Sequence, residues 1–194
     1  MEKLTQEFWN NRYAEGQTGW DMGQISAPLK NYFDQLTNKD IAILIPGCGN
    51  AYEAEYLLNA GFTDVTCIDI SPLLCDRLRA SYADAGLRVL CGDFFEHTAT
   101  YDLIVEQTFF CALDPSLRNH YAAHMHRLLK PVGKLAGLLF SCVFEKEGPP
   151  FGGSAEEYKT YFEPYFEFKV FAPCYNSIPQ RAGNELFVVL NKRD

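Results

Sequence analysis

The sequence lacks several features that would direct it to a membrane or to nucleic acid. No apolar run approaches the roughly 20 residues that cross a bilayer, and charged residues in positions 1–10 replace the apolar core of a secretory signal. Positive charge is also scarce, with 17 Lys and Arg against 25 Asp and Glu and a formal net charge of −8. Because an acidic surface repels phosphates and anionic lipids, we expect a cytoplasmic protein that binds neither nucleic acid nor membranes.

Cysteine and histidine occur without the spacings of a metal site. The seven cysteines form no C-x-x-C pair, so we expect reduced thiols with neither disulfides nor zinc. Cys67 and Cys91 fall in apparent buried strands, where a thiol acts as a small apolar group. His120, His124 and His126 share one predicted helix without an H-E-x-x-H motif, so we expect surface residues and no metal.

The chain does contain the alternation typical of an α/β fold. Its 194 residues, 47% of them hydrophobic, suit one soluble domain. Strands and helices alternate, which favours a mostly parallel sheet, and the two closing strands are joined by a loop and should pair antiparallel. The predicted strands are 41–45, 65–70, 87–91, 101–106, 134–142, 166–171 and 186–190. The predicted helices are 2–15, 26–36, 51–59, one opened by Ser71-Pro72, 115–129 and 154–163.

Ligand-compatible residues follow four successive strands. The first strand runs into Pro46-Gly47-Cys48-Gly49, where small residues let a backbone approach a ligand. Asp69 ends the second strand, 20 residues after Gly49, at a position suited to ribose hydroxyls. Asp93 and Phe94 follow the third strand and suit an adenine ring. Glu106 and Gln107 end the fourth.

Two absences narrow this ligand. There is no G-x-x-x-x-G-K-[ST] motif, which disfavours a P-loop nucleotide enzyme. Tyr52 stands where a dinucleotide fingerprint has its third glycine, which weakens an NAD-dependent dehydrogenase as the alternative. The four strand ends together predict a nucleoside ligand that needs no phosphate site.

Beyond these positions, the chain resembles the thiopurine methyltransferase family, and especially its branch of plant halide/thiol methyltransferases and bacterial relatives. The resemblance rests on motifs in the same order along nearly the whole chain. They are Phe8-Trp9 to Tyr13, Thr18-Gly19-Trp20-Asp21, Pro46-Gly47-Cys48-Gly49, Gly92-Asp93-Phe94, Tyr101-Asp102-Leu103-Ile104, Phe109-Phe110-Cys111-Ala112, Leu128-Leu129-Lys130-Pro131, Gly148-Pro149-Pro150-Phe151 and Ile178-Pro179-Gln180-Arg181.

This resemblance implies a single-domain, Rossmann-like class I methyltransferase with a seven-stranded sheet, an N-terminal helical lid over 1–40 and a core over 41–194. It implies S-adenosylmethionine as cofactor, released as S-adenosylhomocysteine, and a small-molecule acceptor. The implied cofactor-binding residues are Trp9, Tyr13, Trp20, Gly47, Cys48, Gly49, Asp69, Asp93, Phe94 and Gln107. Aromatic rings suit the cationic sulfonium of this cofactor.

The acceptor side is predicted from the same motifs and stays open as to substrate. Glu106, Gln107 and Arg181 are the catalytic candidates, and the expected acceptor pocket is lined by Phe109, Phe110, Phe151, Tyr175 and Arg181. Gln107 departs from the family, where plant proteins have Tyr and animal enzymes have Arg. A thiol or thiopurine-like acceptor is favoured, and a halide, a selenium or tellurium anion, or a non-catalytic cofactor-binding module are the alternatives. The oligomeric state is not predicted.

Overall fold

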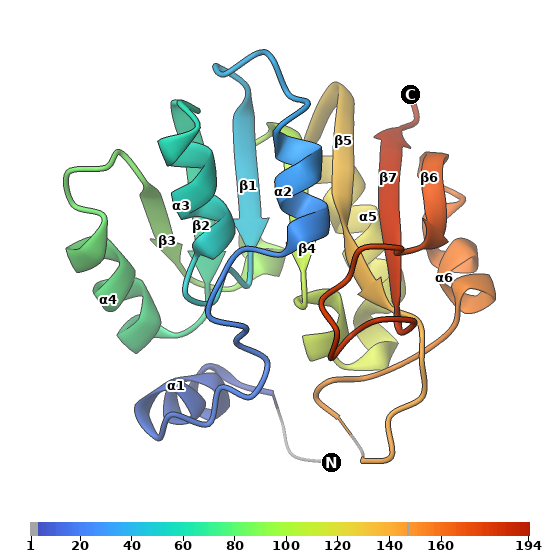
Figure 1. Cartoon of the computed structure of the whole chain (residues 1–194), viewed down its shortest axis with the longest axis horizontal. Helices are drawn as coiled ribbons and strands as arrows, with labels where there is room; N and C mark the ends of the chain where they lie inside the picture. The colour runs from blue at the N-terminus through green and yellow to red at the C-terminus, as the bar shows by residue number, and fades with distance from the viewer. Residues whose placement is uncertain (1–3, 147) are drawn as a thin grey trace. The chain divides into compact units, whose positions relative to one another are not determined.

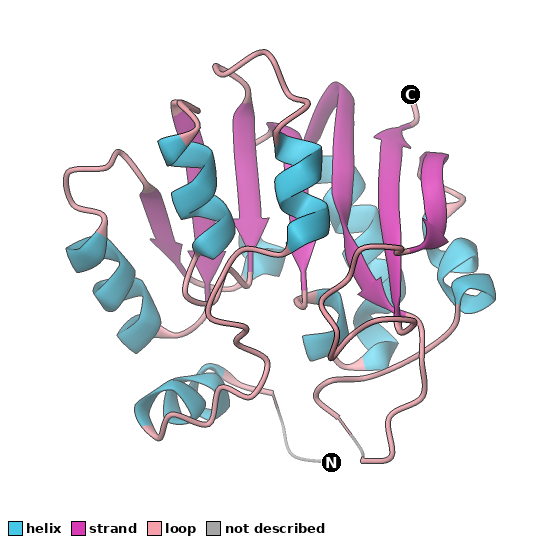
Figure 2. Cartoon of the chain, in the orientation of Figure 1, coloured by secondary structure: helices cyan, strands magenta, loops and turns pink. Residues whose placement is uncertain are grey.

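The computed structural model describes residues 4–146 and 148–194. Its internal contacts divide the chain into two compact units, Met1–His97 and Thr98–Asp194. Figure 1 traces both units in chain order, and Figure 2 shows that each contains strands and helices. The predicted division into a lid over 1–40 and a core over 41–194 does not coincide with this boundary, and the single-domain organisation stays a prediction.

The strands of the first unit are parallel and run in the order β3-β2-β1. Pairing of Pro46 with Ile68, and of Asp69 with Cys91, brings the three carboxyl ends to one edge. The turns that follow these strands therefore lie close together. The elements are α1 (Gln6–Ala14), α2 (Ala27–Phe33), β1 (Ala42–Pro46), α3 (Tyr52–Asn59), β2 (Asp64–Asp69), α4 (Pro72–Ser81), β3 (Arg88–Cys91) and the 3-10 turn η1 (Phe94–Glu96).

Side-chain caps fix where the helices of this unit begin. The Ser71 hydroxyl accepts a hydrogen bond from the backbone N–H of Leu74 at 3.3 Å, and Pro72 takes the first helical position of α4. Ser26 caps α2 in the same way, at 3.4 Å from the N–H of Leu29. Each cap satisfies an N–H that the helix itself cannot bond. The helix starts predicted at both serines are confirmed.

The strands of the second unit run in the order β4-β5-β7-β6. β4 and β5 are parallel, while β7 is antiparallel to both β5 and β6, as predicted for the last strand. Helix α5 packs on β5 and on α6. The elements are β4 (Tyr101–Gln107), η2 (Phe110–Ala112), η3 (Pro115–Leu117), α5 (Arg118–Leu128), β5 (Leu129–Phe140), α6 (Ala155–Phe162), β6 (Phe166–Pro173) and β7 (Glu185–Lys192).

Four details of the sequence prediction are wrong. The helix predicted over 115–129 is a 3-10 turn followed by α5, and β5 begins before Pro131, with an irregular pairing between Leu129 and Lys134. Cys91 is exposed, because β3 pairs on one side only within its unit and is covered poorly. His124 is 2% exposed, on the face of α5 that packs inward.

Among the described residues, no helix is both long and apolar enough to cross a membrane.

Candidate functional site

The turn after β1 has a backbone that only small residues adopt readily. Gly47 and Gly49 have positive φ angles of 56° and 52°, and Ala51 follows at 61°. The N–H of Gly47 donates to the carbonyl of Ile68 at 2.8 Å, which fastens the turn to the end of β2. A side chain at the two glycine positions would be strained in this left-handed conformation. The turn therefore presents bare backbone beside the carboxyl ends of β1 and β2.

Asp69 lies at the end of β2 and is only 8% exposed. Its carboxylate accepts a hydrogen bond from the N–H of Ser71 at 2.9 Å. Burial raises the pKa of Asp69 to about 6, although backbone hydrogen bonds from Ser71, Ile70 and Gly49 act in the opposite direction. The bond from Gly49 joins this carboxylate to the glycine turn, so Asp69 organises the strand ends.

Three aromatic residues of the N-terminal segment form one cluster. Trp20 contacts Trp9 with ring centroids 5.6 Å apart and Tyr13 at 5.8 Å, both edge to face. Tyr13 is buried, whereas both tryptophans are half-buried and keep part of their rings accessible. The Tyr13 hydroxyl lies 4.0 Å from where a Cβ on Gly49 would be. Tyr13 thus lies beside the predicted glycine turn, and the two tryptophans belong to the same aromatic cluster through Trp20.

Burial keeps Tyr13 protonated. Its pKa is raised far above the ordinary value by burial first and then by the Asp69 carboxylate, while a side-chain hydrogen bond with Trp20 acts the other way. Cys48 in the turn is also held as a neutral thiol, because a hydrogen bond with Cys67 and burial raise its pKa. A neutral thiol is a poor nucleophile. The thiol of Cys48 is therefore held in its unreactive form.

Two polar anchors of this segment, Asn10 and Asp21, were not predicted from the sequence. The Asn10 side-chain oxygen accepts hydrogen bonds from the Ser71 hydroxyl and the N–H of Leu73, both at 3.0 Å, at the start of α4. Asp21 accepts from the Asn50 amide and from the Tyr52 hydroxyl, the latter at 3.3 Å. These contacts join residues far apart in sequence, so no local pattern indicates them.

A third anchor, Glu53, works in the same way. Glu53 accepts from the N–H of Ser26 at 3.2 Å and is only 6% exposed. The N-terminal segment is therefore fastened to the first turns of both α3 and α4.

The predicted adenine site lies after β3. Asp93 accepts the N–H of Phe95 at 2.8 Å and thereby caps the turn η1. Phe94 is 5% exposed and contacts Phe95 at a centroid distance of 5.2 Å. The N–H of Gly92 donates to the Asp69 carbonyl at 2.9 Å, which ties this turn to the end of β2. The predicted positions after all three strands of the first unit are thus brought to one edge.

In the second unit, Glu106 is a buried anchor for the turn that follows β4. Its carboxylate accepts the N–H groups of Phe109 at 2.7 Å and Phe110 at 2.9 Å, and the hydroxyl of Tyr121. Burial raises the pKa of Glu106 to about 7, opposed by these three hydrogen bonds. Glu106 is 0% exposed and its carboxylate is bonded in this way, so it positions the turn. It does not face a methyl acceptor, which the sequence had led us to expect.

This turn contains a residue with a strained backbone, Thr108, and a hydrogen-bond acceptor without a partner, the side-chain oxygen of Gln107. Thr108 has a φ angle of 59°, which a β-branched residue rarely adopts. The side-chain oxygen of Gln107 is buried without a hydrogen-bond partner among the described residues. Buried polar atoms are normally bonded, so an unsatisfied one marks a place where a ligand can supply the donor. Gln107 therefore keeps its place as a candidate.

The five predicted acceptor-pocket residues have different surroundings. Phe109 and Phe151 are half-buried, and the N–H of Phe151 donates to the Cys111 carbonyl at 2.7 Å. Phe110 is 1% exposed and packs on Tyr121 at 5.0 Å, so it belongs to the core and does not line a pocket. Tyr175 is 92% exposed, so the prediction that it lines an enclosed pocket is wrong.

Arg181 is buried in an ion pair. Its guanidinium lies 3.3 Å from Glu185, with side-chain exposures of 8% and 3%, and 5.2 Å above the Phe140 ring. The carboxylate compensates the charge of Arg181. An anionic acceptor would therefore have to compete with Glu185 for this guanidinium.

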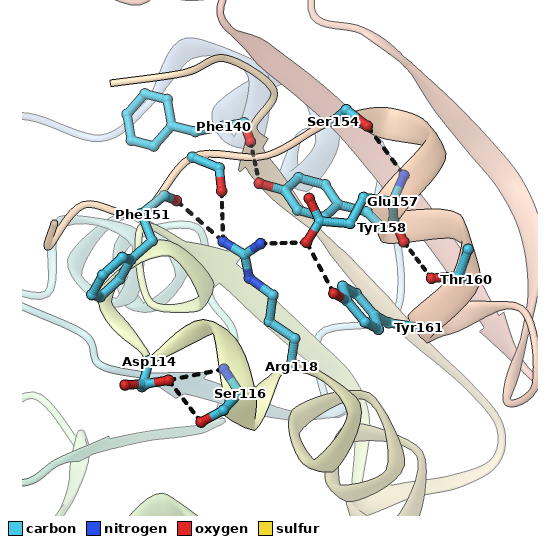
Figure 3. A network of polar contacts seen from close by, with 11 residues as sticks. Asp114, Ser116, Arg118, Phe140, Phe151, Ser154, Glu157, Tyr158, Thr160 and Tyr161 are labelled. Atoms are coloured by element: carbon cyan, nitrogen blue, oxygen red, sulfur yellow. Dashed lines mark hydrogen bonds and ion pairs between the residues drawn. The ribbon is translucent and has the colours of Figure 1, made fainter. Parts of the chain in front are cut away.

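A further arginine was missed by the sequence analysis. Arg118 is 2% exposed at the start of α5 and bonds the carbonyl of Gly152 at 2.7 Å, next to Phe151 (Figure 3). Within the described residues no three His, Cys, Asp or Glu side chains are grouped to hold a metal ion, and all seven cysteines are free thiols.

A family comparison decides between the enzyme classes left open by these residues. The model of a family described as thiopurine S-methyltransferase matches residues 4–189 of this chain. The chain belongs to the thiopurine S-methyltransferase family.

Members of the thiopurine S-methyltransferase family from plants and bacteria are similar to this chain along most of its length. A probable thiol methyltransferase 2 of Arabidopsis thaliana is 30% identical over 170 residues, which cover 84% of this chain and 75% of that protein. A thiopurine S-methyltransferase of Vibrio campbellii is 28% identical over 185 residues, or 82% of each chain. The predicted resemblance is confirmed.

A solved structure shows the same fold. The 1,6-didemethyltoxoflavin N1-methyltransferase of Burkholderia thailandensis, determined with 1,6-didemethyltoxoflavin and S-adenosylhomocysteine bound, aligns with a TM-score of 0.77. The alignment covers 98% of this chain and 88% of that one at 17% identity, which is evidence for the fold alone. The α/β methyltransferase fold predicted from the sequence is confirmed. As a member of the thiopurine S-methyltransferase family, the chain is a methyltransferase and not a dehydrogenase.

Proposed function

We propose that this enzyme transfers the methyl group of S-adenosylmethionine to the sulfur of a small thiol in the cytoplasm. The observation that carries the proposal is the Tyr13 hydroxyl beside the glycine turn after β1, with the Trp20 ring packed on Tyr13. A turn with exposed backbone, an adjacent buried carboxylate and half-buried aromatic rings suits a nucleoside with a cationic sulfur. The names of the relatives, thiol and thiopurine methyltransferase, support sulfur as the acceptor atom.

The cofactor is proposed to bind to the edge formed by the first unit. Gly47, Cys48 and Gly49 would lie under it, Asp69 would accept its ribose hydroxyls, and Asp93 with Phe94 would hold its adenine. Trp9, Tyr13 and Trp20 would cover the sulfonium. The residues fit this group, because Asp69 is buried at the strand end and the tryptophan rings stay partly accessible. When bound, the cofactor supplies a methyl group already activated by positive sulfur.

The acceptor is proposed to use residues of the second unit. The thiolate sulfur forms a bond to the methyl carbon while the bond from that carbon to the sulfonium sulfur breaks, and the thiol proton goes to solvent. A thiol with a pKa of about 8.5 is already a few per cent ionised at neutral pH, so no strong base is needed. Gln107 would orient the acceptor or the cofactor, and Phe109 and Phe151 would pack on it and exclude water.

The ion pair of Arg181 bears on the alternatives. Because Glu185 compensates the guanidinium, Arg181 offers little net attraction to a halide or an oxyanion, whereas a thiol can enter uncharged and lose its proton afterwards. The net charge of −8 likewise disfavours nucleic acid and anionic membranes as partners.

A panel of acceptors tests the proposal. The purified enzyme would be given S-adenosylmethionine with thiophenol, sodium hydrosulfide, 6-mercaptopurine, sodium iodide or sodium selenite, and both products would be measured. We expect S-adenosylhomocysteine together with a methylated thiol. Methylation of iodide or selenite alone would contradict sulfur as the acceptor, and cofactor binding without any product would identify a non-catalytic binding protein.

A further inference from the structure

Arg118 is a buried cation that holds a segment without regular structure. The segment runs from Gly148 to Gly153 and contains no helix or strand. The guanidinium of Arg118 donates to the carbonyl of Gly152 at 2.7 Å and, more weakly, to that of Phe151 at 3.5 Å. Figure 3 shows the guanidinium fork of Arg118, with one terminal nitrogen directed at both carbonyls and the other at Glu157. We call residues 148–153 the acceptor loop, because the proposed acceptor residue Phe151 lies in it.

The acceptor loop is held on both sides of Phe151. The N–H of Phe151 donates to the carbonyl of Cys111, in the turn that follows β4, at 2.7 Å. On the other side, Arg118 binds the carbonyls of Phe151 and Gly152. The space at Gly152 is closed, since a Cβ there would lie 2.0 Å from the Cys142 carbonyl oxygen. The place of the Phe151 ring therefore depends on contacts of its backbone.

The charge of Arg118 is compensated by groups of α6 and of the turn after β4, and two of them, Glu157 and Tyr158, also lie against Gly153 at the end of the acceptor loop. Glu157 accepts from the guanidinium at 2.7 Å and also accepts from the Tyr161 hydroxyl at 2.9 Å. The rings of Phe110 and Tyr158 lie 5.1 and 5.2 Å from the guanidinium carbon. These contacts fix the direction of the fork, which a flexible ammonium group could not reproduce.

One further feature indicates a role beyond stability. The Nε atom of Arg118 is buried and has no hydrogen-bond partner within the part of the chain that is described. An unsatisfied buried donor is costly, and an apolar side chain would avoid that cost. What an apolar side chain cannot do is bind two successive carbonyls of the acceptor loop.

We propose that Arg118 is a positioning residue that sets acceptor selectivity by fixing the Phe151 ring through the backbone of the acceptor loop. The inference rests on the proposed thiol methyltransferase function. Arg118 does not touch the reacting atoms. Its effect should grow with the apolar area of the acceptor, because a ring packs on Phe151 whereas a hydrosulfide ion has little surface to pack.

The test compares two acceptors in two variants and a control. Arg118→Lys keeps the charge but loses the fork, and Phe151→Ala removes the ring that the fork positions. Arg127→Lys is the matched control, because Arg127 is an exposed arginine of the same helix. KM and kcat would be measured for thiophenol and sodium hydrosulfide, and the dissociation constant of S-adenosylhomocysteine by calorimetry.

We expect Arg118→Lys and Phe151→Ala to raise the KM for thiophenol, relative to that for hydrosulfide, roughly tenfold or more. Affinity for S-adenosylhomocysteine should stay within about twofold of the parent, and Arg127→Lys should match the parent. A purely structural loss would lower kcat for both acceptors equally and leave the KM ratio unchanged.

An unchanged KM ratio in Phe151→Ala, or in a folded Arg118→Lys, would overturn the inference. Should the lysine variant not fold, Gly152→Ala displaces the same loop with Arg118 intact and must shift the ratio in the same direction. A parent enzyme that methylates neither thiol would refute the proposed function itself, and this is known before any variant is made.

Discussion

Replacing Glu106 with glutamine should flatten the pH dependence of unfolding between about pH 4.5 and 7. The pKa of Glu106 is raised by burial from 4.5 to about 7. Between these values the folded protein keeps a proton that the unfolded chain has released. The stability from this group is therefore complete below pH 4.5 and is lost as the pH rises towards 7.

The size of the effect follows from the same two values. A pKa difference of roughly 2.5 units corresponds to about 3 kcal/mol of unfolding free energy. Glutamine keeps a side-chain oxygen for the N–H groups of Phe109 and Phe110, and its amide can donate to the Tyr121 oxygen. Tyr121 itself stays protonated, since burial raises its pKa. The variant should therefore fold with the turn intact.

Urea unfolding at several pH values measures the prediction. The free-energy difference between Glu106→Gln and the parent should change by about 3 kcal/mol, in favour of the variant, from about pH 4.5 to 7.5. Glu167→Gln, at an exposed position of β6, is the matched control and should run parallel to the parent. Parallel curves for Glu106→Gln and the parent would refute the assignment of a buried, proton-binding anchor.

Four further predictions concern the two units. Trp20→Ala should weaken binding of S-adenosylmethionine about 2- to 30-fold by calorimetry, the range of a cation–π contact, and equal affinity would remove Trp20 from the site. The affinity of the parent for S-adenosylmethionine should fall as the pH drops through about 6, where Asp69 gains a proton. Asp69→Asn should bind the cofactor weakly at every pH. The same pH dependence of affinity in both proteins would show that the Asp69 carboxylate does not bind the cofactor. Asn10→Ala should lower Tm by about 2–4 °C through two lost hydrogen bonds at α4, and an unchanged Tm would argue against this anchor. Gln107→Tyr should change the acceptor profile with little change in cofactor affinity, and matching profiles would place Gln107 outside the acceptor site.

Local signals account for the parts of the fold that the sequence predicted well. Ser71-Pro72 and Ser26 predict the N-termini of helices correctly, because a helix cap involves only residues that are close in sequence. The continuous apolar run before Pro46 predicts a buried strand, and all five residues of β1 are indeed buried. Cys91 was misjudged, since an apolar residue at the end of a strand does not reveal how many neighbours that strand has.

The candidate site was predictable where a ligand position follows a strand end, and not where distant side chains meet. Gly47, Gly49 and Asp69 fall into the first class. Asn10 and Arg118 fall into the second class, because their partners are distant in sequence. Asn10 bonds Ser71, 61 residues away, and Arg118 bonds Gly152, 34 residues away. Tyr175 and Phe110 show the opposite error. An aromatic residue near a motif lines a pocket only if it is neither fully exposed nor enclosed by the core.

Transfer of a labelled methyl group tests the central claim most directly. The enzyme would be mixed with thiophenol and S-adenosylmethionine that carries a trideuterated methyl group, and the products would be identified by mass spectrometry. The account predicts trideuterated methyl phenyl sulfide and S-adenosylhomocysteine in equal amounts. Formation of neither compound above the rate without enzyme would contradict it.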